Sequence, residues 1–221
     1  SVIRENCGKI AKQISVKRNK TAQKIKTEVK EVLNQLGIPD AKFEVLIKQD
    51  SNSLSDYYIT LEGKSCKSYD NGFDEVEFFI STNTGEDPKP LVKVASGGEV
   101  SRIMLALKSI LAKSDKLPLL IFDEIDTGVS GRIAQKVGNA LASLSYFHQI
   151  IAITHLPQIA GFANHHYSVE KQTIDGRVIS SIRKLEDNER IEEIAKLMSG
   201  EKITETSLNG AKELINSSRQ L

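Results

Sequence analysis

Two adjacent carboxylates, Asp123 and Glu124, follow a short apolar run at residues 119–122. An apolar run of this length after a proline predicts a strand that is buried on both faces. Open α/β sheets bind ligands at the carboxyl ends of their strands, so we expect the two acids at such an edge. Paired carboxylates there suit a magnesium ion and a water nucleophile, which nucleotide hydrolysis requires. The alternative is a helix N-cap or a surface turn.

Two further segments have residue types that suit a phosphate group. Ser96, Gly97 and Gly98 precede a helical pattern, so backbone N–H groups at a helix N-terminus can approach an anion there. His155 follows a second apolar run at 150–154. A flexible helix entry and a structural histidine are the alternatives. The sequence contains no G-x-x-x-x-G-K-[ST] phosphate loop, so we expect the chain to carry half of a nucleotide site.

Helix and strand patterns alternate from residue 97 onward. They predict, in order, a helix of about four turns that ends before Lys116, the strand at 119–122, a helix at roughly 132–145 and a strand at 150–154. Such a β-α-β unit requires parallel strands and a right-handed crossover, so Glu124 and His155 are expected at the same edge of the sheet. The remaining patterns predict a hairpin and two helices, at 167–172 with 177–185, at 188–198 and at 204–218.

The first 90 residues have a different organisation. Residues 1–36 have helical periodicity, and a polar stretch at 15–21 predicts either a shift of the apolar seam or a break in the helix. An amphipathic helix on its own domain and the root of a longer coiled coil both fit this pattern. Alternation within 43–81 predicts an antiparallel meander with one solvated face. The predicted domains are a helix at 1–36, an antiparallel β segment at 37–90 and an α/β lobe at 91–221. The seam before the polar stretch consists of Ile3, Cys7, Ile10 and Ile14.

The composition indicates a globular protein without a membrane anchor. Apolar residues make up 39% of the chain and charged residues 27%, which is ordinary. No apolar run approaches the roughly 18 residues of a membrane span, and no signal peptide is visible. Two cysteines, Cys7 and Cys66, are too few for a disulfide framework or a zinc site, which favours a reducing cytosol. The chain begins within a helical pattern, without Met, so we expect a segment of a longer protein.

The net charge of +1 conceals an excess of basic residues near the N-terminus. Lysines and arginines greatly outnumber acids between Lys9 and Lys30. A basic helix of this kind is compatible with a position near nucleic acid. The alternative is the solvated face of a coiled coil, and the sequence does not separate the two.

The order of the motifs resembles the second half of an ABC-type ATPase head, in which a signature motif precedes Walker B and a switch histidine. The resemblance is specific to the RecN family, the SMC-like DNA repair ATPases of bacteria. It rests on three long segments and extends over essentially the whole chain. These segments are 93–108 (KVASGGEVSRIMLALK), 121–131 (IFDEIDTGVSG) and 153–160 (ITHLPQIA).

The resemblance implies a role for each motif residue. Asp123 would hold magnesium, Glu124 would orient or deprotonate the attacking water, and His155 would contact the γ-phosphate of ATP. The signature residues would contact the nucleotide of a second head; they are Ser96, Gly97, Gly98 and Glu99. The D-loop between the two sites would comprise Thr127, Gly128, Val129 and Ser130. Ala95 and Ser130 depart from the general ABC pattern, which has leucine and aspartate there.

One further residue, Arg102, follows the signature motif. It is expected either to couple the nucleotide state to the coil or to pair with an acid.

The expected fold is therefore the C-terminal half of an ABC-type head, with a parallel sheet, flanking helices, an antiparallel β lobe and a coiled-coil-root helix. The resemblance implies an ATPase that acts in DNA double-strand break repair and recombination in the cytoplasm, associated with the nucleoid. Its expected partners are an N-terminal Walker A segment of the same protein, a second head in a homodimer, and DNA. The chain alone is expected to be inactive. An ATP-independent DNA-binding or scaffold module is the alternative; a transporter domain is disfavoured because it would carry its own phosphate loop.

Overall fold

The computed structural model describes residues 2–50, 57–94, 96–114, 117–174, 177–200 and 202–218. The chain forms two compact units. Unit 1 consists of Ser1–Asn34 and Ile38–Ala95, and unit 2 of Gln35–Gly37 and Ser96–Leu221. The predicted domain boundaries near residues 36 and 90 stay a prediction.

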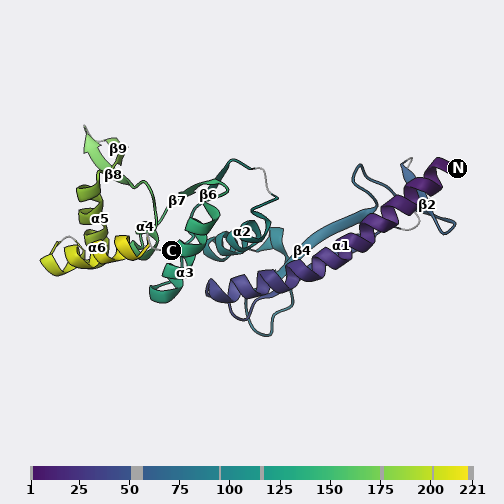
Figure 1. The fold of residues 1–221 in the computed structure, drawn as a ribbon, viewed down its shortest axis with the longest axis horizontal. Helices are drawn as coiled ribbons and strands as arrows, with labels where there is room; N and C mark the ends of the chain where they lie inside the picture. Colours follow the sequence, from purple (N-terminus) through teal and green to yellow (C-terminus); the bar gives the residue numbers. More distant parts are fainter. Residues whose placement is uncertain are drawn as a thin grey trace. The chain divides into compact units, whose positions relative to one another are not determined.

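Nearly all of the long helix α1 (Val2–Gln35) belongs to unit 1; it is drawn in purple in Figure 1. The helix is continuous through residues 15–21, so of the two predicted alternatives, a shift of the apolar seam or a break, the break is wrong. Its buried residues recur at helical spacing and are Gly8, Ala11, Ser15, Ala22, Val29 and Leu33. A Cβ at residue 8 would overlap the carbonyl oxygen of Thr60, so glycine there allows the neighbouring strand to approach closely.

The seam predicted from Ile3 to Ile14 is a different stripe of α1 from the one that packs on the strands. Ile3 is 78% exposed and Ile10 is 58% exposed. Cys7 is also exposed. The second helix of a coiled coil would cover such a stripe. The coiled-coil interpretation therefore stays a prediction.

The strands of unit 1 form two sheets rather than the predicted meander. β1 (Lys42–Gln49) pairs antiparallel with β4 (Asp74–Ser81), which also pairs with β5 (Lys89–Pro90). β2 (Tyr58–Leu61) and β3 (Lys64–Lys67) form a separate hairpin. A turn of 3-10 helix, η1 (Leu91–Lys93), follows β5. The small core beneath the hairpin consists of Ala11, Ile59, Cys66 and Phe73.

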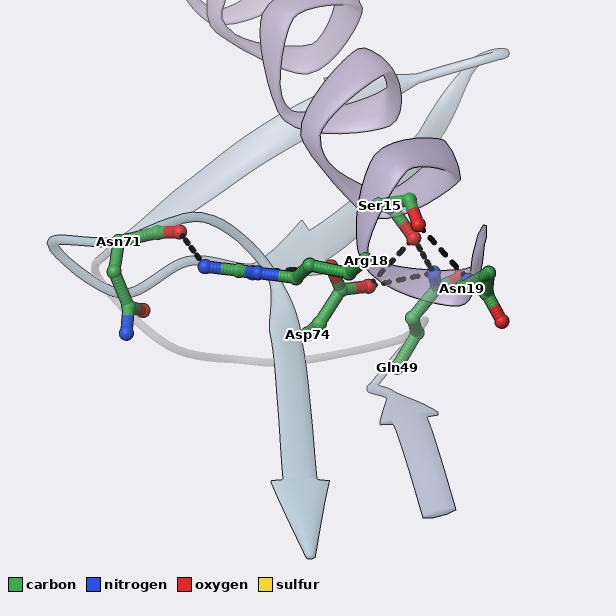
Figure 2. Close-up of polar contacts among 6 residues, drawn as sticks. All are labelled: Ser15, Arg18, Asn19, Gln49, Asn71 and Asp74. Carbon is green, nitrogen blue, oxygen red and sulfur yellow. Dashed lines mark hydrogen bonds and ion pairs between the residues drawn. The ribbon is translucent and has the colours of Figure 1, made fainter. Parts of the chain in front are cut away.

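A buried polar network joins α1 to the β1–β4 sheet (Figure 2). The carboxylate of Asp74 accepts hydrogen bonds from Ser15 Oγ at 2.8 Å and Gln49 Nε2 at 2.9 Å. It also accepts one from Arg18 Nη1 at 3.0 Å, and Arg18 Nη2 donates to the carbonyl of Asn71 at 2.6 Å. Burial raises the pKa of Asp74, but the hydrogen bonds from Gln49, Ser15 and Arg18 outweigh it and lower that pKa.

Unit 2 has alternating helices and strands. After α2 (Gly97–Leu111), β6 (Leu119–Phe122), α3 (Gly131–Leu144) and β7 (Gln149–Ala152) form the predicted β-α-β unit. A short helix, α4 (Pro157–Ala160), leads to the hairpin of β8 (Tyr167–Ile174) and β9 (Arg177–Lys184). The unit ends with α5 (Asp187–Ser199) and α6 (Glu205–Ser218), which pack around the buried Ile194 and Ala211.

The strand β6 is not buried on both faces, which corrects the prediction made from its apolar run. Ile121 is 61% exposed, and Ile153, just after β7, is 57% exposed. Phe122 on the opposite face of β6 is buried. Among the described residues this sheet consists of β6 and β7, and its face with Ile121 and Ile153 is exposed.

Within the described residues, no helix combines the length and the apolar character that a membrane crossing needs.

Candidate functional site

The candidate site lies at the carboxyl ends of β6 and β7 in unit 2. The two strands pair in parallel, with Phe122 opposite Ala152. Ile153 N donates to Phe122 O at 2.9 Å, which continues the ladder one residue further. The structure therefore brings the segment after residue 122 and the segment after residue 152 to one edge, as the spacing predicts.

The acid pair forms the turn that leaves β6. Both Asp123 and Glu124 are exposed, and Glu124 N donates to Asp123 Oδ1 at 2.9 Å. Glu124 has φ of 55°, in the left-handed region that non-glycine residues rarely occupy. Such backbone costs on the order of 1 kcal/mol and persists only where neighbours hold it. The main chain of the acid pair is therefore held by other elements.

Helix α2 is the element that holds this turn. Ser101 Oγ donates to the carbonyl of Asp123 at 2.6 Å. Arg102 Nη1 donates to the carbonyl of Thr127 at 2.7 Å. The side chain of Arg102 is buried, and this burial lowers the pKa of its guanidinium against the opposing effect of Glu99. Two donors from successive residues of α2 thus fix the main chain on both sides of Glu124.

The two glycines of the predicted signature lie directly against the acid turn. A Cβ at residue 97 would overlap Glu124 Oε2, so the carboxylate of Glu124 occupies the space above Gly97. A Cβ at residue 98 would lie 2.8 Å from Thr127 Cβ and 2.9 Å from Thr127 O. Glycine is required at residue 98 because the main chain of the turn approaches α2 too closely for a side chain there, whereas the atoms nearest residue 97 belong to the end of the Glu124 side chain. Ser96 and Glu99 flank this contact, and Ser96 is exposed.

The predicted D-loop forms a tight turn between β6 and α3. Thr127 N donates to Glu124 O at 3.1 Å and Val129 N to Asp126 O at 3.3 Å. Gly128 has φ of 74°, which glycine adopts without strain. Thr127, Gly128 and Ser130 are exposed, whereas Val129 is half-buried.

His155 is held by an acid that the sequence analysis did not single out. Asp126 Oδ2 lies 2.9 Å from His155 Nδ1 and accepts a hydrogen bond from His155 N at 2.8 Å. The His155 side chain is 74% exposed, whereas Asp126 is buried. Asp126 stands two residues after Glu124, and its burial carries no signal in the sequence pattern.

The donors present are compatible with magnesium and a phosphate group. Among the described residues, no group of three or more His, Cys, Asp or Glu is arranged to hold a metal by protein ligands alone. Magnesium does not need such a cage, because it typically uses one or two carboxylates together with water and substrate phosphates. The exposed carboxylate of Asp123 suits that role, and the helix N-terminus at Gly97 and Gly98 suits an anion.

Sequence relatives support the resemblance to the RecN family. No protein-family model matches the chain. The DNA repair protein RecN of Halalkalibacterium halodurans is 42% identical over 199 residues, which cover 90% of this chain and 33% of that protein. RecN of Bacillus subtilis is 37% identical over 211 residues, 96% of this chain and 37% of that protein. The chain is a relative of the RecN proteins. It spans about a third of the length of these RecN sequences.

A solved structure supports the fold. The Smc head domain with a coiled coil and joint from Pyrococcus yayanosii matches 82% of this chain and 30% of its own chain, with a TM-score of 0.50 and 18% identity. At this identity the match concerns the fold alone. The expected α/β head fold, with a parallel sheet, flanking helices, antiparallel strands and an N-terminal helix, is confirmed for this RecN relative.

Proposed function

We propose that the chain supplies one half of a composite ATP site in an SMC-like DNA repair ATPase. The observation that carries this proposal is the contact between α2 and the acid turn, where the Glu124 carboxylate lies over Gly97. That contact gathers the acid pair and a glycine-opened helix N-terminus in one place. Parallel pairing of β6 and β7 adds the histidine at the same edge. The similarity to RecN proteins supports a role in double-strand break repair and recombination.

In the proposed site, Asp123, Glu124 and His155 have separate roles. Bound magnesium neutralises phosphate charge, and the Asp123 carboxylate would hold it directly or through water. The Glu124 carboxylate orients or deprotonates the water that attacks the γ-phosphate. His155 offers its exposed ring to that phosphate. The residues proposed to face the nucleotide of a second copy are Ser96, Gly97, Gly98 and Glu99, with Thr127, Gly128, Val129 and Ser130 between the two sites.

The uncovered face of the β6–β7 sheet supports the proposed partner within the same protein. Leu119, Ile121, Ile151 and Ile153 are exposed there. An apolar sheet face of this kind is stabilised when another layer covers it. We assign that layer to the segment of the same protein that carries the phosphate loop.

We further propose that the protein acts on DNA in the cytoplasm, at the nucleoid.

The test is to measure ATP hydrolysis with and without the phosphate-loop segment of the same protein. The chain alone should release no phosphate above background, because no lysine loop cradles the β- and γ-phosphates. Adding the phosphate-loop segment, or joining it to the chain, should restore hydrolysis. Turnover by the highly purified chain alone contradicts the half-site, and no turnover in the assembled head contradicts the ATPase.

A second candidate function is DNA binding without nucleotide, favoured by the charge on α1. Lys9, Lys17 and Lys20 are exposed on the side of the helix opposite its buried residues, and they form no ion pair with a described residue. Arg18, by contrast, is held by Asp74. Free lysines along one face of a helix suit contacts to a phosphodiester backbone.

Replacing Lys17 and Lys20 with glutamine should therefore weaken DNA binding. The variant should have a lower affinity for DNA at low salt. The slope of log affinity against log salt concentration should be shallower by about 2, which corresponds to the loss of two phosphate contacts. The matched control replaces Lys12 and Lys26 with glutamine. These lysines pair with Glu62 and Glu44, so the control removes the same amount of charge from the same helix. Equal effects of the two double variants, measured by fluorescence anisotropy, exclude a site on this face.

A further inference from the structure

Asp126 is the buried member of the three acids that follow β6. It is 4% exposed, whereas Asp123 and Glu124 face solvent. One oxygen, Oδ2, accepts from Thr154 Oγ1 at 2.6 Å and from His155 N at 2.8 Å, and it lies 2.9 Å from His155 Nδ1. A buried carboxylate is costly unless such donors compensate it, and among the described residues the donors to this one belong to the segment that carries the histidine.

The contact at Nδ1 determines how the imidazole ring is protonated. An unprotonated Nδ1 and a carboxylate oxygen would repel each other at 2.9 Å, so we infer that Nδ1 carries the proton. In the neutral ring the other nitrogen, Nε2, is then the unprotonated one. Because the ring is 74% exposed while Asp126 is buried, Nε2 is the nitrogen available to a ligand at the sheet edge.

The same carboxylate fixes the main chain around the histidine. Thr154 Oγ1 donates to Asp126 and accepts from Leu156 N at 3.0 Å, so residues on both sides of His155 are held. The carbonyl of Asp126 accepts from Val129 N within the turn of Thr127 to Ser130. The position of His155 is therefore tied to this turn through one residue.

We propose that Asp126 is a positioning residue: it holds His155 as the Nδ1–H tautomer, with Nε2 presented at the edge where the phosphate of the nucleotide would lie. The role toward phosphate rests on the proposed function, whereas the tautomer does not. Asp126 touches neither nucleotide nor water in this arrangement and acts through His155. Its carboxylate keeps the ring at one orientation relative to the acid turn, so no rotamer or tautomer search precedes contact with the phosphate.

The first experiment determines the tautomer in the 221-residue chain by long-range ¹H–¹⁵N NMR of the imidazole, at a pH where the ring is neutral. The unchanged chain should have the proton of His155 on Nδ1, and finding it on Nε2 overturns the proposal without any variant. D126A should move the proton to Nε2, the tautomer preferred by the free ring. T154A is the matched control, because it removes a donor to the same carboxylate but leaves the contact at Nδ1, so its tautomer should stay unchanged. D126N, which keeps an acceptor oxygen, should retain the tautomer if the D126A chain does not fold.

The second experiment measures ATP hydrolysis in the assembled head. D126A should lower kcat by about 10- to 100-fold with KM within about twofold, and D126N should recover part of the loss. A fall in KM and kcat together, or no change, contradicts positioning of the histidine. If the assembled head hydrolyses no ATP at all, the proposed function fails, and the tautomer result still decides whether Asp126 holds the ring.

Discussion

Replacing Glu124 with glutamine is expected to stop ATP turnover in the assembled head while nucleotide stays bound. Glutamine keeps the size of glutamate, so the close contact over Gly97 and the left-handed backbone at residue 124 are retained. The amide cannot accept a proton from water, and loss of a general base typically costs about 10²–10⁴-fold in rate. We expect at least a 100-fold fall in kcat, measured by phosphate release.

The trapped state provides a second readout for the same variant. With hydrolysis blocked, ATP should hold two heads together, so E124Q should elute as a dimer in ATP but not in ADP. E192Q is the matched control, because Glu192 is an exposed acid on α5, away from the acid turn in the sequence. A variant with normal turnover would show that Glu124 is not the base.

Replacing Asp74 with alanine is expected to destabilise unit 1. The substitution removes the carboxylate that accepts from Ser15 and Gln49, leaves Gln49 Nε2 with Ser15 Oγ as its acceptor, and leaves Arg18 without its counter-charge. Removing one member of a buried charged network costs about 3–5 kcal/mol, and the partial exposure of Arg18 reduces this to about 2–3 kcal/mol. Amide hydrogen exchange in α1 and β4 should therefore accelerate by roughly 30- to 150-fold. E75A, which changes the exposed neighbouring acid on the same strand, should change exchange little.

The stability that D74A loses relative to the unchanged chain should become smaller as the pH falls. The pKa of Asp74 is lower in the folded protein than in the unfolded chain, so the unfolded chain binds more protons as the solution is acidified. The stabilisation is complete above the ordinary aspartate range, near pH 4–5, and is lost as pH falls through the lowered pKa. The difference between the unchanged chain and D74A should therefore shrink on acidification. A difference that grows below pH 4 contradicts the ionised network.

Local patterns predicted the elements of unit 2 well. The Gly97 helix, the two strands and the crossover helix have periodicity and breakers within each segment, and the parallel register then brings residue 124 and residue 155 to one edge. Pairing across long sequence distances was less predictable. The period of β1 does not distinguish β2 from β4 as its partner, so the predicted meander was wrong in order. The exposure of Ile121 was not predicted. An apolar run indicates that a strand favours burial, but it does not show whether other elements of the chain cover both of its faces.

Within the candidate site, the exposed residues that would contact nucleotide or magnesium were easier to predict from the sequence than the residues that hold them in place. Asp123, Glu124 and His155 stand out by type and position. Asp126 and Ser101 do not, and the contact of Arg102 with the Thr127 carbonyl was not predicted, because such roles depend on which carbonyl or ring lies opposite the residue after folding. The buried network around Asp74 is of the same kind, since it joins residues 15, 49 and 74 from three separate elements. Such residues become identifiable only when burial and direction are known.

The close approach of Gly97 to Glu124 has a consequence for protein engineering. The acid pair cannot be transplanted alone onto another parallel sheet, because its left-handed backbone is held by a helix that approaches the turn closely at Gly98. A graft would need the glycine-opened turn of α2, with Ser101 and Arg102 as its two clamps, in the same register. The end of β6 and the N-terminus of α2 would have to be transferred together, because neither segment alone determines the geometry of the other.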